Sequence, residues 1–254
     1  MRQRILAGNW KMHKRLGEAE SFVEQLLLQD NLGNLEIFLA VPSTLLYPLS
    51  QILKSSCNKS IRITLGAQNI HDAESGAFTG EISAAMAADA GAKFVLLGHS
   101  ERRTLFHEDD SWITKKLRSA LNHGLKPLLC VGENEAQLLQ GERELVIRRQ
   151  LKVALEKISP EEVSSLVVAY EPVWAIGTGK NAAAAEAEEV HKLCRTILQQ
   201  LFSEDIAEEI PILYGGSVKP DNAAEFGLQA DIDGLLVGGA SLQIGSFLEI
   251  ATFL

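Results

Sequence analysis

Short apolar runs recur along the chain at regular intervals, and each of them predicts a buried strand. The runs are rich in branched side chains and lack the polar alternation expected of a strand with one solvated face. This pattern is typical of strands that are covered on both faces, as in parallel sheets. The eight runs are residues 5–7, 37–41, 61–65, 94–97, 128–131, 166–170, 212–214 and 235–237.

Helical periodicity fills the segments between these runs. Apolar residues at spacings of three and four form stripes in residues 19–27, 113–121, 151–158 and 190–201. Weaker helical patterns cover residues 43–54, 81–90, 218–226 and 241–253. Strands that alternate with helices in this way are expected to be parallel and joined by helical crossovers.

The number of these strand–helix units limits the architectures that the chain can adopt. Eight units in 254 residues predict an α/β fold, a closed eight-stranded parallel (β/α)8 barrel. A doubly wound open sheet is the alternative, because periodicity alone does not separate the two. The sequence shows no Pro-, Gly- or Ser-rich linker and no low-complexity segment, so we expect residues 1–254 to form a single domain.

Composition and charge narrow the possible partners. The chain has 46% hydrophobic and 22% charged residues, which are ordinary values for a globular protein. Its formal net charge of −9 argues against nucleic acid or an anionic membrane surface as the main partner. A small anionic substrate is still compatible with this charge, because one cleft can be locally positive on an acidic protein.

The sequence indicates a cytoplasmic protein with reduced thiols. The longest uncharged stretch, residues 37–53, contains two prolines and several polar residues and is not expected to span a membrane. The residues before Asn9 are too few for the apolar part of a signal peptide. The cysteines Cys57, Cys130 and Cys194 are odd in number and widely spaced, which favours free thiols over disulfides or a zinc site.

Two glycine-rich turns follow the last two predicted strands, at residues 215–217 and 238–239. In a (β/α)8 barrel, the carboxyl ends of the strands are where the chemistry is found. We expect each turn to open a helix, so that its backbone N–H groups and the helix N-terminus together bind an anion. A single turn of this kind often reflects loop geometry alone, but two on adjacent strands favour a phosphate site.

Three reactive side chains, Lys11, His99 and Glu171, also fall at predicted strand ends. Lys11 is the only cation at these positions that we expect to project into the barrel mouth. His99 precedes a predicted helix, whose positive end disfavours an imidazolium, so we expect a neutral ring that can donate a hydrogen bond to a carbonyl. Glu171 precedes Pro172, which favours an extended backbone, and a desolvated carboxylate there could act as a base. The ordinary alternatives are a solvated lysine, a structural histidine and a surface carboxylate.

The loop after Glu171 is unusually apolar. Residues 173–179 read VWAIGTG. Apolar side chains on a loop suggest a lid that closes over a bound molecule.

Together these motifs resemble the triosephosphate isomerase family. The matching segments are residues 8–12 (GNWKM), 98–103 (GHSERR), 169–180 (AYEPVWAIGTGK), 214–218 (YGGSV) and 233–242 (DGLLVGGASL). They extend over essentially the whole chain in the family's order. The resemblance implies a TIM barrel enzyme of glycolysis and gluconeogenesis, an isomerase that interconverts dihydroxyacetone phosphate and D-glyceraldehyde 3-phosphate through an enediolate. It also implies that no metal or organic cofactor is needed.

The same resemblance implies a role for each site residue. Glu171 would move the proton between C1 and C2, and neutral His99 would polarise the carbonyl and shuttle protons between the two oxygens. Lys11 would stabilise the anionic substrate with Asn9 beside it, and Glu101 would lie near Lys11. The phosphate would rest on backbone N–H groups of Gly177, Ser217, Gly238 and Gly239.

A partner subunit is implied as well. Residues 68–83, with GAFTGE at positions 76–81, resemble the loop through which two subunits of the family interlock. Thr79 would then reach the region of Asn9 and Lys11 in the neighbour, so we expect a homodimer. Alternatively, the loop could simply cover its own barrel.

Two other interpretations are compatible with parts of this pattern. Another phosphate-binding barrel enzyme would share the glycine turns, but it should lack the lid sequence and the pairing of His99 with Glu171. A catalytically silent barrel that serves as a binding protein would be expected to have lost Lys11, His99 or Glu171. All three residues are present.

Overall fold

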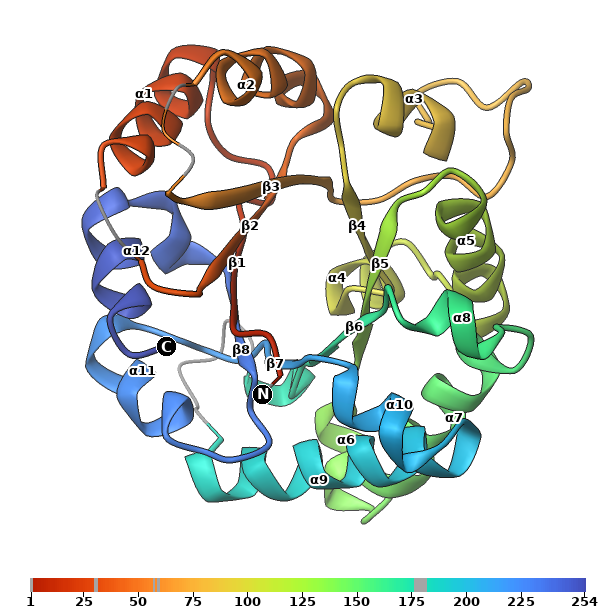
Figure 1. Ribbon diagram of the computed structural model, residues 1–254. Coiled ribbons are helices and arrows are strands. Elements are labelled where there is room, and N and C mark those ends of the chain that lie inside the picture. The colour runs from red at the N-terminus through yellow and green to blue at the C-terminus, as the bar shows by residue number, and fades with distance from the viewer. Residues whose placement is uncertain (1, 30–31, 57, 59, 176–181) are drawn as a thin grey trace.

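The computed structural model describes residues 2–29, 32–56, 58, 60–175 and 182–254, and it shows a closed barrel (Figure 1). All neighbouring strands are parallel, and β8 pairs with β1 to close the sheet. The strands are β1 (Ile5–Asn9), β2 (Glu36–Val41), β3 (Arg62–Ala67), β4 (Phe94–Leu97), β5 (Lys126–Val131), β6 (Val167–Tyr170), β7 (Ile212–Tyr214) and β8 (Gly234–Val237). The predicted barrel is therefore confirmed, and the open sheet is wrong.

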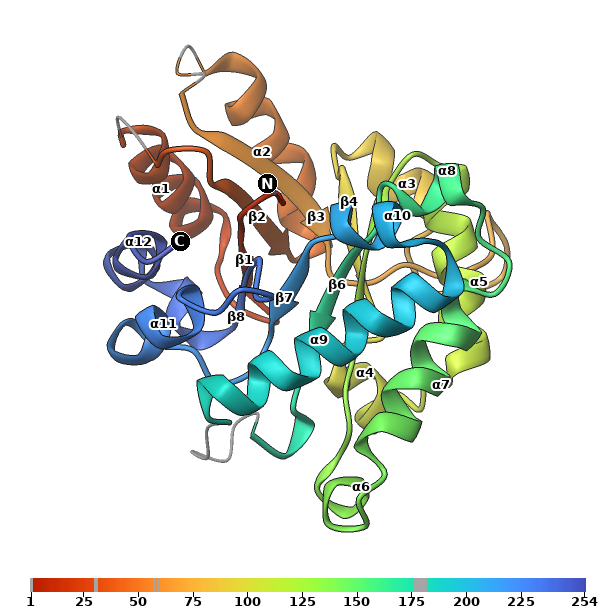
Figure 2. The same cartoon turned by 60° about the horizontal axis from the view of Figure 1, so that its bottom comes forward.

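Helices surround the barrel on its outside (Figures 1 and 2). The α-helices are α1 (Leu16–Leu27), α2 (Ser43–Ser55), α3 (Ala84–Asp89), α4 (Ser100–Leu105), α5 (Asp110–Asn122), α6 (Glu135–Leu139), α7 (Arg143–Leu155), α8 (Pro160–Val163), α9 (Ala184–Leu201), α10 (Glu204–Glu209), α11 (Pro220–Gly227) and α12 (Ile244–Ala251). Two short 3₁₀ helices, η1 (Val173–Ala175) and η2 (Gly239–Leu242), follow β6 and β8. Among the helices that the structure describes, none has both the length and the apolar character needed to span a bilayer.

Side chains fill the inside of the barrel, so it is a packed core and not a channel. The rings of Phe38 on β2 and Phe94 on β4 lie 4.6 Å apart in this interior. The intervening strand β3 has Gly66, where a Cβ atom would lie only 2.4 Å from the Phe94 ring. Glycine at this position therefore makes room for the Phe94 ring.

A second, larger core lies between the strands and the helices. Helix α1 shows why the helical stripes predicted this layer: Phe22, on its buried face, packs edge-on against Trp10 with ring centroids 5.2 Å apart. The helix begins where the Glu18 side chain accepts a hydrogen bond from the Arg15 N–H at 2.7 Å. This contact pairs one of the donors that a helix start leaves without an intrahelical partner.

Several helix boundaries differ from those predicted by periodicity. Helix α3 starts at Ala84 because the Ser83 hydroxyl accepts the Met86 N–H and caps it. The segment 241–253 is divided, since Gln243 is extended (φ −112°, ψ 123°) between η2 and α12. Helices α6, α8 and α10 are too short to give a periodic stripe and were not predicted.

His191 on α9 is fully buried behind the strands that lead to the barrel mouth. Its ring lies 5.8 Å from the Tyr170 ring and 6.3 Å from the Tyr214 ring, and Nδ1 lies 2.7 Å from the Ala187 carbonyl oxygen. Burial lowers the pKa of His191 below its usual value. The unfolded chain therefore binds a proton at a pH where the folded chain does not.

We expect His191 to make the fold less stable in mild acid. Its contribution should be complete above pH ~6.5 and decline below it, by up to about 1.4 kcal/mol per pH unit for one proton. Denaturant unfolding of the parent and of His191→Gln at pH 7.5 and 5.5 measures this. The stability advantage of the parent should shrink at the lower pH, and an advantage that stays constant would contradict the assignment.

Candidate active site

The loop after β1 places Lys11 in the barrel mouth with a strained backbone. Lys11 has φ +50°, a left-handed conformation that is uncommon for a residue with a Cβ atom. The Asn9 side chain accepts the Lys11 N–H at 3.0 Å, and Gln68 Nε2 donates to the Lys11 carbonyl oxygen at 2.8 Å. The Lys11 ammonium donates to Glu101 Oε1 at 2.6 Å. These contacts hold the amine at one defined position in the mouth.

His99 caps helix α4 with its own ring. Its Nδ1 accepts the Glu101 N–H at 3.2 Å. A nitrogen that accepts this bond carries no proton, so the geometry fits a neutral ring with the hydrogen on Nε2. Nε2 lies 3.0 Å from Glu171 Oε1. In this form the side chain of His99 presents a single donor to the mouth, and its neutral state stays a prediction.

Glu171 is buried directly beyond the end of β6. Its Oε2 accepts the Ser100 N–H at 2.8 Å, in addition to the contact of Oε1 with His99. Glycines directly after both neighbouring strands, β5 and β7, make this placement possible. A Cβ atom on Gly132 would lie 1.8 Å from the Glu171 carbonyl oxygen, and one on Gly215 would lie 3.0 Å from Glu171 Cγ.

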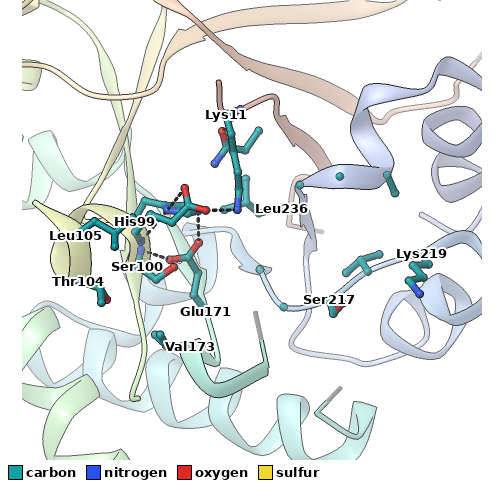
Figure 3. A pocket seen from close by; sticks show the side chains of 18 residues that line it. Lys11, His99, Ser100, Thr104, Leu105, Glu171, Val173, Ser217, Lys219 and Leu236 are labelled. Carbon is teal, nitrogen blue, oxygen red and sulfur yellow. Dashed lines mark hydrogen bonds and ion pairs between the residues drawn. The ribbon is translucent and has the colours of Figure 1, made fainter. Parts of the chain in front are cut away.

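A cavity of about 490 Å³ opens between these groups and the glycine turns (Figure 3). His99 and Glu171 lie on one side of it, and Ser217 lies on the opposite side. Gly238 and Gly239 also line it, and a Cβ atom on Gly238 would be 3.6 Å from Lys11 Cε. The structure therefore brings Asn9, Lys11, His99, Glu101, Glu171, Ser217, Gly238 and Gly239 to one cavity, while Gly177 lies outside the described residues.

Two expectations about the phosphate side need correction. The turn at residues 215–217 does not itself open a helix, because α11 begins only at Pro220, a residue well suited to the first helical position since it has no N–H. The second concerns the cations, since the expectation for Lys11 considered strand ends only. Lys219, just before α11, lines the same cavity (Figure 3). Its position after a turn and not at a strand end kept it out of the sequence prediction.

Sequence reasoning also missed a buried carboxylate beside the site. Glu133 follows β5, and its Oε1 accepts hydrogen bonds from Tyr170 Oη at 3.1 Å, Trp174 Nε1 at 2.9 Å and Arg143 Nε at 2.9 Å. Burial raises the pKa of the Tyr170 hydroxyl, which therefore stays a donor. Glu133 ties the start of the loop after Glu171 to the barrel, and its place at a strand end was the signal that could have found it.

The described residues contain no group of three or more His, Cys, Asp or Glu side chains placed to hold a metal ion. The mouth of the barrel contains a buried carboxylate (Glu171), an imidazole that can donate a hydrogen bond (His99) and an ammonium group (Lys11). Beside them lie glycine turns that suit an anion. This arrangement at the carboxyl ends of a (β/α)8 barrel is that of an enzyme that moves protons on a small phosphorylated substrate.

Comparisons with known proteins identify the family. The family model described as triosephosphate isomerase matches residues 4–254. A triosephosphate isomerase of Protochlamydia amoebophila is 48% identical over 246 residues, which cover 97% of this chain and 91% of the relative. Those of Chlamydia trachomatis (48% over 250 residues, 98% and 89% covered) and Chloroflexus aurantiacus (45% over 251 residues, 98% of both) are similar as well. The chain belongs to the triosephosphate isomerase family, and it is an isomerase.

Proposed function

We propose that Glu171, His99 and Lys11 are the groups with which this isomerase interconverts dihydroxyacetone phosphate and D-glyceraldehyde 3-phosphate. The observation that carries this assignment is the contact of 3.0 Å between His99 Nε2 and Glu171 Oε1 at the edge of a cavity that Lys11, Gly238 and Gly239 also line. A base and a hydrogen-bond donor there face the same small volume, as a proton transfer beside a carbonyl requires.

The first half of the reaction follows from these positions. Glu171 removes a proton from C1 of dihydroxyacetone phosphate, and the electron pair forms a C1–C2 double bond while charge develops on the C2 oxygen. The Nε2–H of His99 donates to that oxygen, and the Lys11 ammonium stabilises the negative charge. All three groups line the cavity.

The second half needs His99 to be neutral. His99 gives its Nε2 proton to the C2 oxygen and takes the proton of the C1 hydroxyl, so that its charge at the end equals its charge at the start. Glu171 then returns a proton to C2, which yields glyceraldehyde 3-phosphate. The hydrogen bond from the Glu101 N–H to Nδ1 supports this role, because it holds Nδ1 free of a proton.

We expect the substrate's phosphate to bind beside the two glycine turns. Ser217, Gly238 and Gly239 offer backbone N–H groups there, and Lys219 adds a second positive charge to that of Lys11. Gly177 completes the set by resemblance to the family and stays a prediction.

One experiment tests the assignment as a whole. Purified protein should convert glyceraldehyde 3-phosphate to dihydroxyacetone phosphate without added metal, and in deuterium oxide the product should carry deuterium at the carbon that Glu171 reprotonates. Exchange is expected because a carboxylic acid at the mouth can exchange its proton with solvent. Conversion by another route, such as a hydride shift between the carbons, would proceed without incorporation and would rule out Glu171 as the base.

A homodimer through residues 68–83 is the second proposal, and the shape of this segment supports it. The loop is held in a fixed form, since the tilted rings of His71 and Phe78 contact each other with centroids 4.1 Å apart and Trp112 Nε1 donates to Asp72 at 2.8 Å. A hollow of about 380 Å³ lies beside Lys11 and Asn9 and is lined in part by Gln68 and Phe106. Met12, at its edge, is 96% exposed. A second subunit's loop would fill this hollow and cover Met12.

The dimer leads to a prediction about mass and activity. The native mass in solution should be about twice 27.7 kDa at micromolar concentration. A variant in which residues 73–78 are shortened should give folded monomers with poor activity, because Asn9 and Lys11 lose a support from the neighbour. Light scattering and the isomerase assay together check this, and a fully active monomer would show that the loop serves only its own barrel.

A cytoplasmic location is also proposed, on the grounds of thiol chemistry. Cys130 and Cys194 are buried and free, and burial raises the pKa of the Cys194 thiol to about 12. Such thiols suit a reducing compartment, where no disulfide forms.

A further inference from the structure

Lys14 lies in the loop between β1 and α1 and has an unusual backbone. Its φ is +71°, a left-handed conformation that glycine adopts freely and that strains a residue with a Cβ atom. The Lys14 ammonium lies 5.0 Å from the centre of the Trp10 ring and 4.6 Å from that of the Phe22 ring, and it donates to the Leu242 carbonyl oxygen at 2.8 Å. The side chain therefore reaches from the β1 loop to the end of η2.

The Lys14 ammonium bonds the end of the 3₁₀ helix η2, whose residues are tightly linked to one another by hydrogen bonds. Leu242 is its last residue, and Gly238 directly precedes it. The N–H and the hydroxyl of buried Ser241 both donate to the Gly238 carbonyl oxygen, at 2.9 and 2.7 Å. A Cβ atom on Gly8 would lie 3.1 Å from Ser241 Cβ, so η2 packs directly on β1. A shift of the Leu242 carbonyl is thus transmitted to the turn at Gly238 and Gly239.

We infer that Lys14 is a positioning residue for the phosphate, which ties the loop that carries Asn9 and Lys11 to the turn that carries Gly238 and Gly239. The two segments come from opposite ends of the sequence but face each other closely, since a Cβ atom on Gly238 would lie 3.6 Å from Lys11 Cε. A small relative displacement would move the Lys11 ammonium away from the N–H groups with which it must act. The inference deepens the proposed function and rests on it.

The chemistry of the contact explains why a lysine serves here. An ammonium group placed between two aromatic faces is attracted by both rings, and a carbonyl oxygen takes one of its hydrogens. Burial lowers the pKa of Lys14, with the nearby Glu18 carboxylate acting in the opposite direction. Because the group is partly desolvated, its hydrogen bond to Leu242 is stronger than the same bond would be in water.

Substitution of Lys14 tests the link through phosphate affinity. Lys14→Met keeps an apolar stem on the rings but removes the ammonium, and Lys14→Gly also relieves the backbone strain, so that at least one variant is expected to fold. We expect the inhibition constant of inorganic phosphate and the KM to rise roughly tenfold in both variants, with a smaller change in kcat. Lys14→Arg should restore most of the affinity, since a guanidinium can stack on the rings and donate to Leu242. Lys192→Met, at an exposed lysine on α9, is the matched control.

A second readout separates this inference from the proposed function. Hydrogen exchange at the amides of residues 239–242 should be faster in Lys14→Met than in the parent, whether or not phosphate is present. Normal exchange and unchanged phosphate inhibition, even with a lower Tm, would overturn the inference and leave a purely structural lysine. If inorganic phosphate fails to inhibit the parent protein at all, the phosphate site is wrong. In that case the positioning role is wrong with it, while faster exchange would report only the mechanical link.

Discussion

Glu171→Asp is expected to lower kcat by about a hundredfold or more, with little change in the affinity for phosphate. The substitution withdraws the carboxylate by one methylene group, so it no longer reaches the carbon from which it must take a proton. The oxygens also leave the Ser100 N–H and His99 Nε2, which now hold them at 2.8 and 3.0 Å. Ser217 lies on the other side of the cavity, and the substitution leaves it, Gly238 and Gly239 unchanged. Steady-state kinetics with inorganic phosphate as inhibitor measure both effects.

The control for this prediction is Glu24→Asp, the same change at an exposed position on α1. It should have normal kinetics. The fold of Glu171→Asp should also be intact, because the smaller side chain creates no clash with Gly132 or Gly215. A Glu171→Asp variant that turns over at a near-normal rate would exclude this carboxylate from the proton transfer.

The strands could be predicted from the sequence because parallel strands covered on both faces form uninterrupted apolar runs, and their number, not their periodicity, favoured the barrel over an open sheet. Residues 94–97 and 212–214 are strands β4 and β7 within the boundaries expected. The ends of other elements depend on single contacts that periodicity does not report. The cap of Ser83 on α3 and the extended Gln243 between η2 and α12 are of this kind.

The candidate site was predictable to the extent that its residues follow strands directly. Lys11, His99 and Glu171 meet this condition, and the structure places all three around one cavity. Glu133 also follows a strand, β5, and this position was a usable signal, but the contacts that mark it as important form only on folding. Lys219 follows a turn and gave no such signal. Glu133 acquires three donors from β6, η1 and α7, and Lys219 comes to the mouth through a turn whose path no local pattern specifies.

Lys11→Met is expected to reduce kcat/KM by roughly a thousandfold, the largest loss among the cation substitutions at the mouth. The ammonium is the positive group placed between the proton-transfer side and the glycine turns, since it bonds Glu101 at 2.6 Å and passes close to Gly238. Without it, the enediolate charge loses its stabilising cation and the phosphate loses one of two lysines. Both kcat and the phosphate inhibition constant should therefore worsen, unlike in Glu171→Asp, where only kcat changes.

Two further variants show whether the effects of Lys11→Met are specific to this position. Lys219→Met removes the other cavity-lining cation, which lies on the phosphate side only, and should weaken phosphate inhibition with a much smaller effect on kcat. Lys152→Met, on the exposed face of α7, should change neither and controls for the loss of one positive charge from an acidic protein. The backbone strain at Lys11 is common to lysine and methionine, so Lys11→Met should fold with a Tm near that of the parent. If Lys11→Met keeps the parent's phosphate inhibition constant and loses only kcat, then the glycine turns and Lys219 hold the phosphate without it, and Lys11 acts on the enediolate alone.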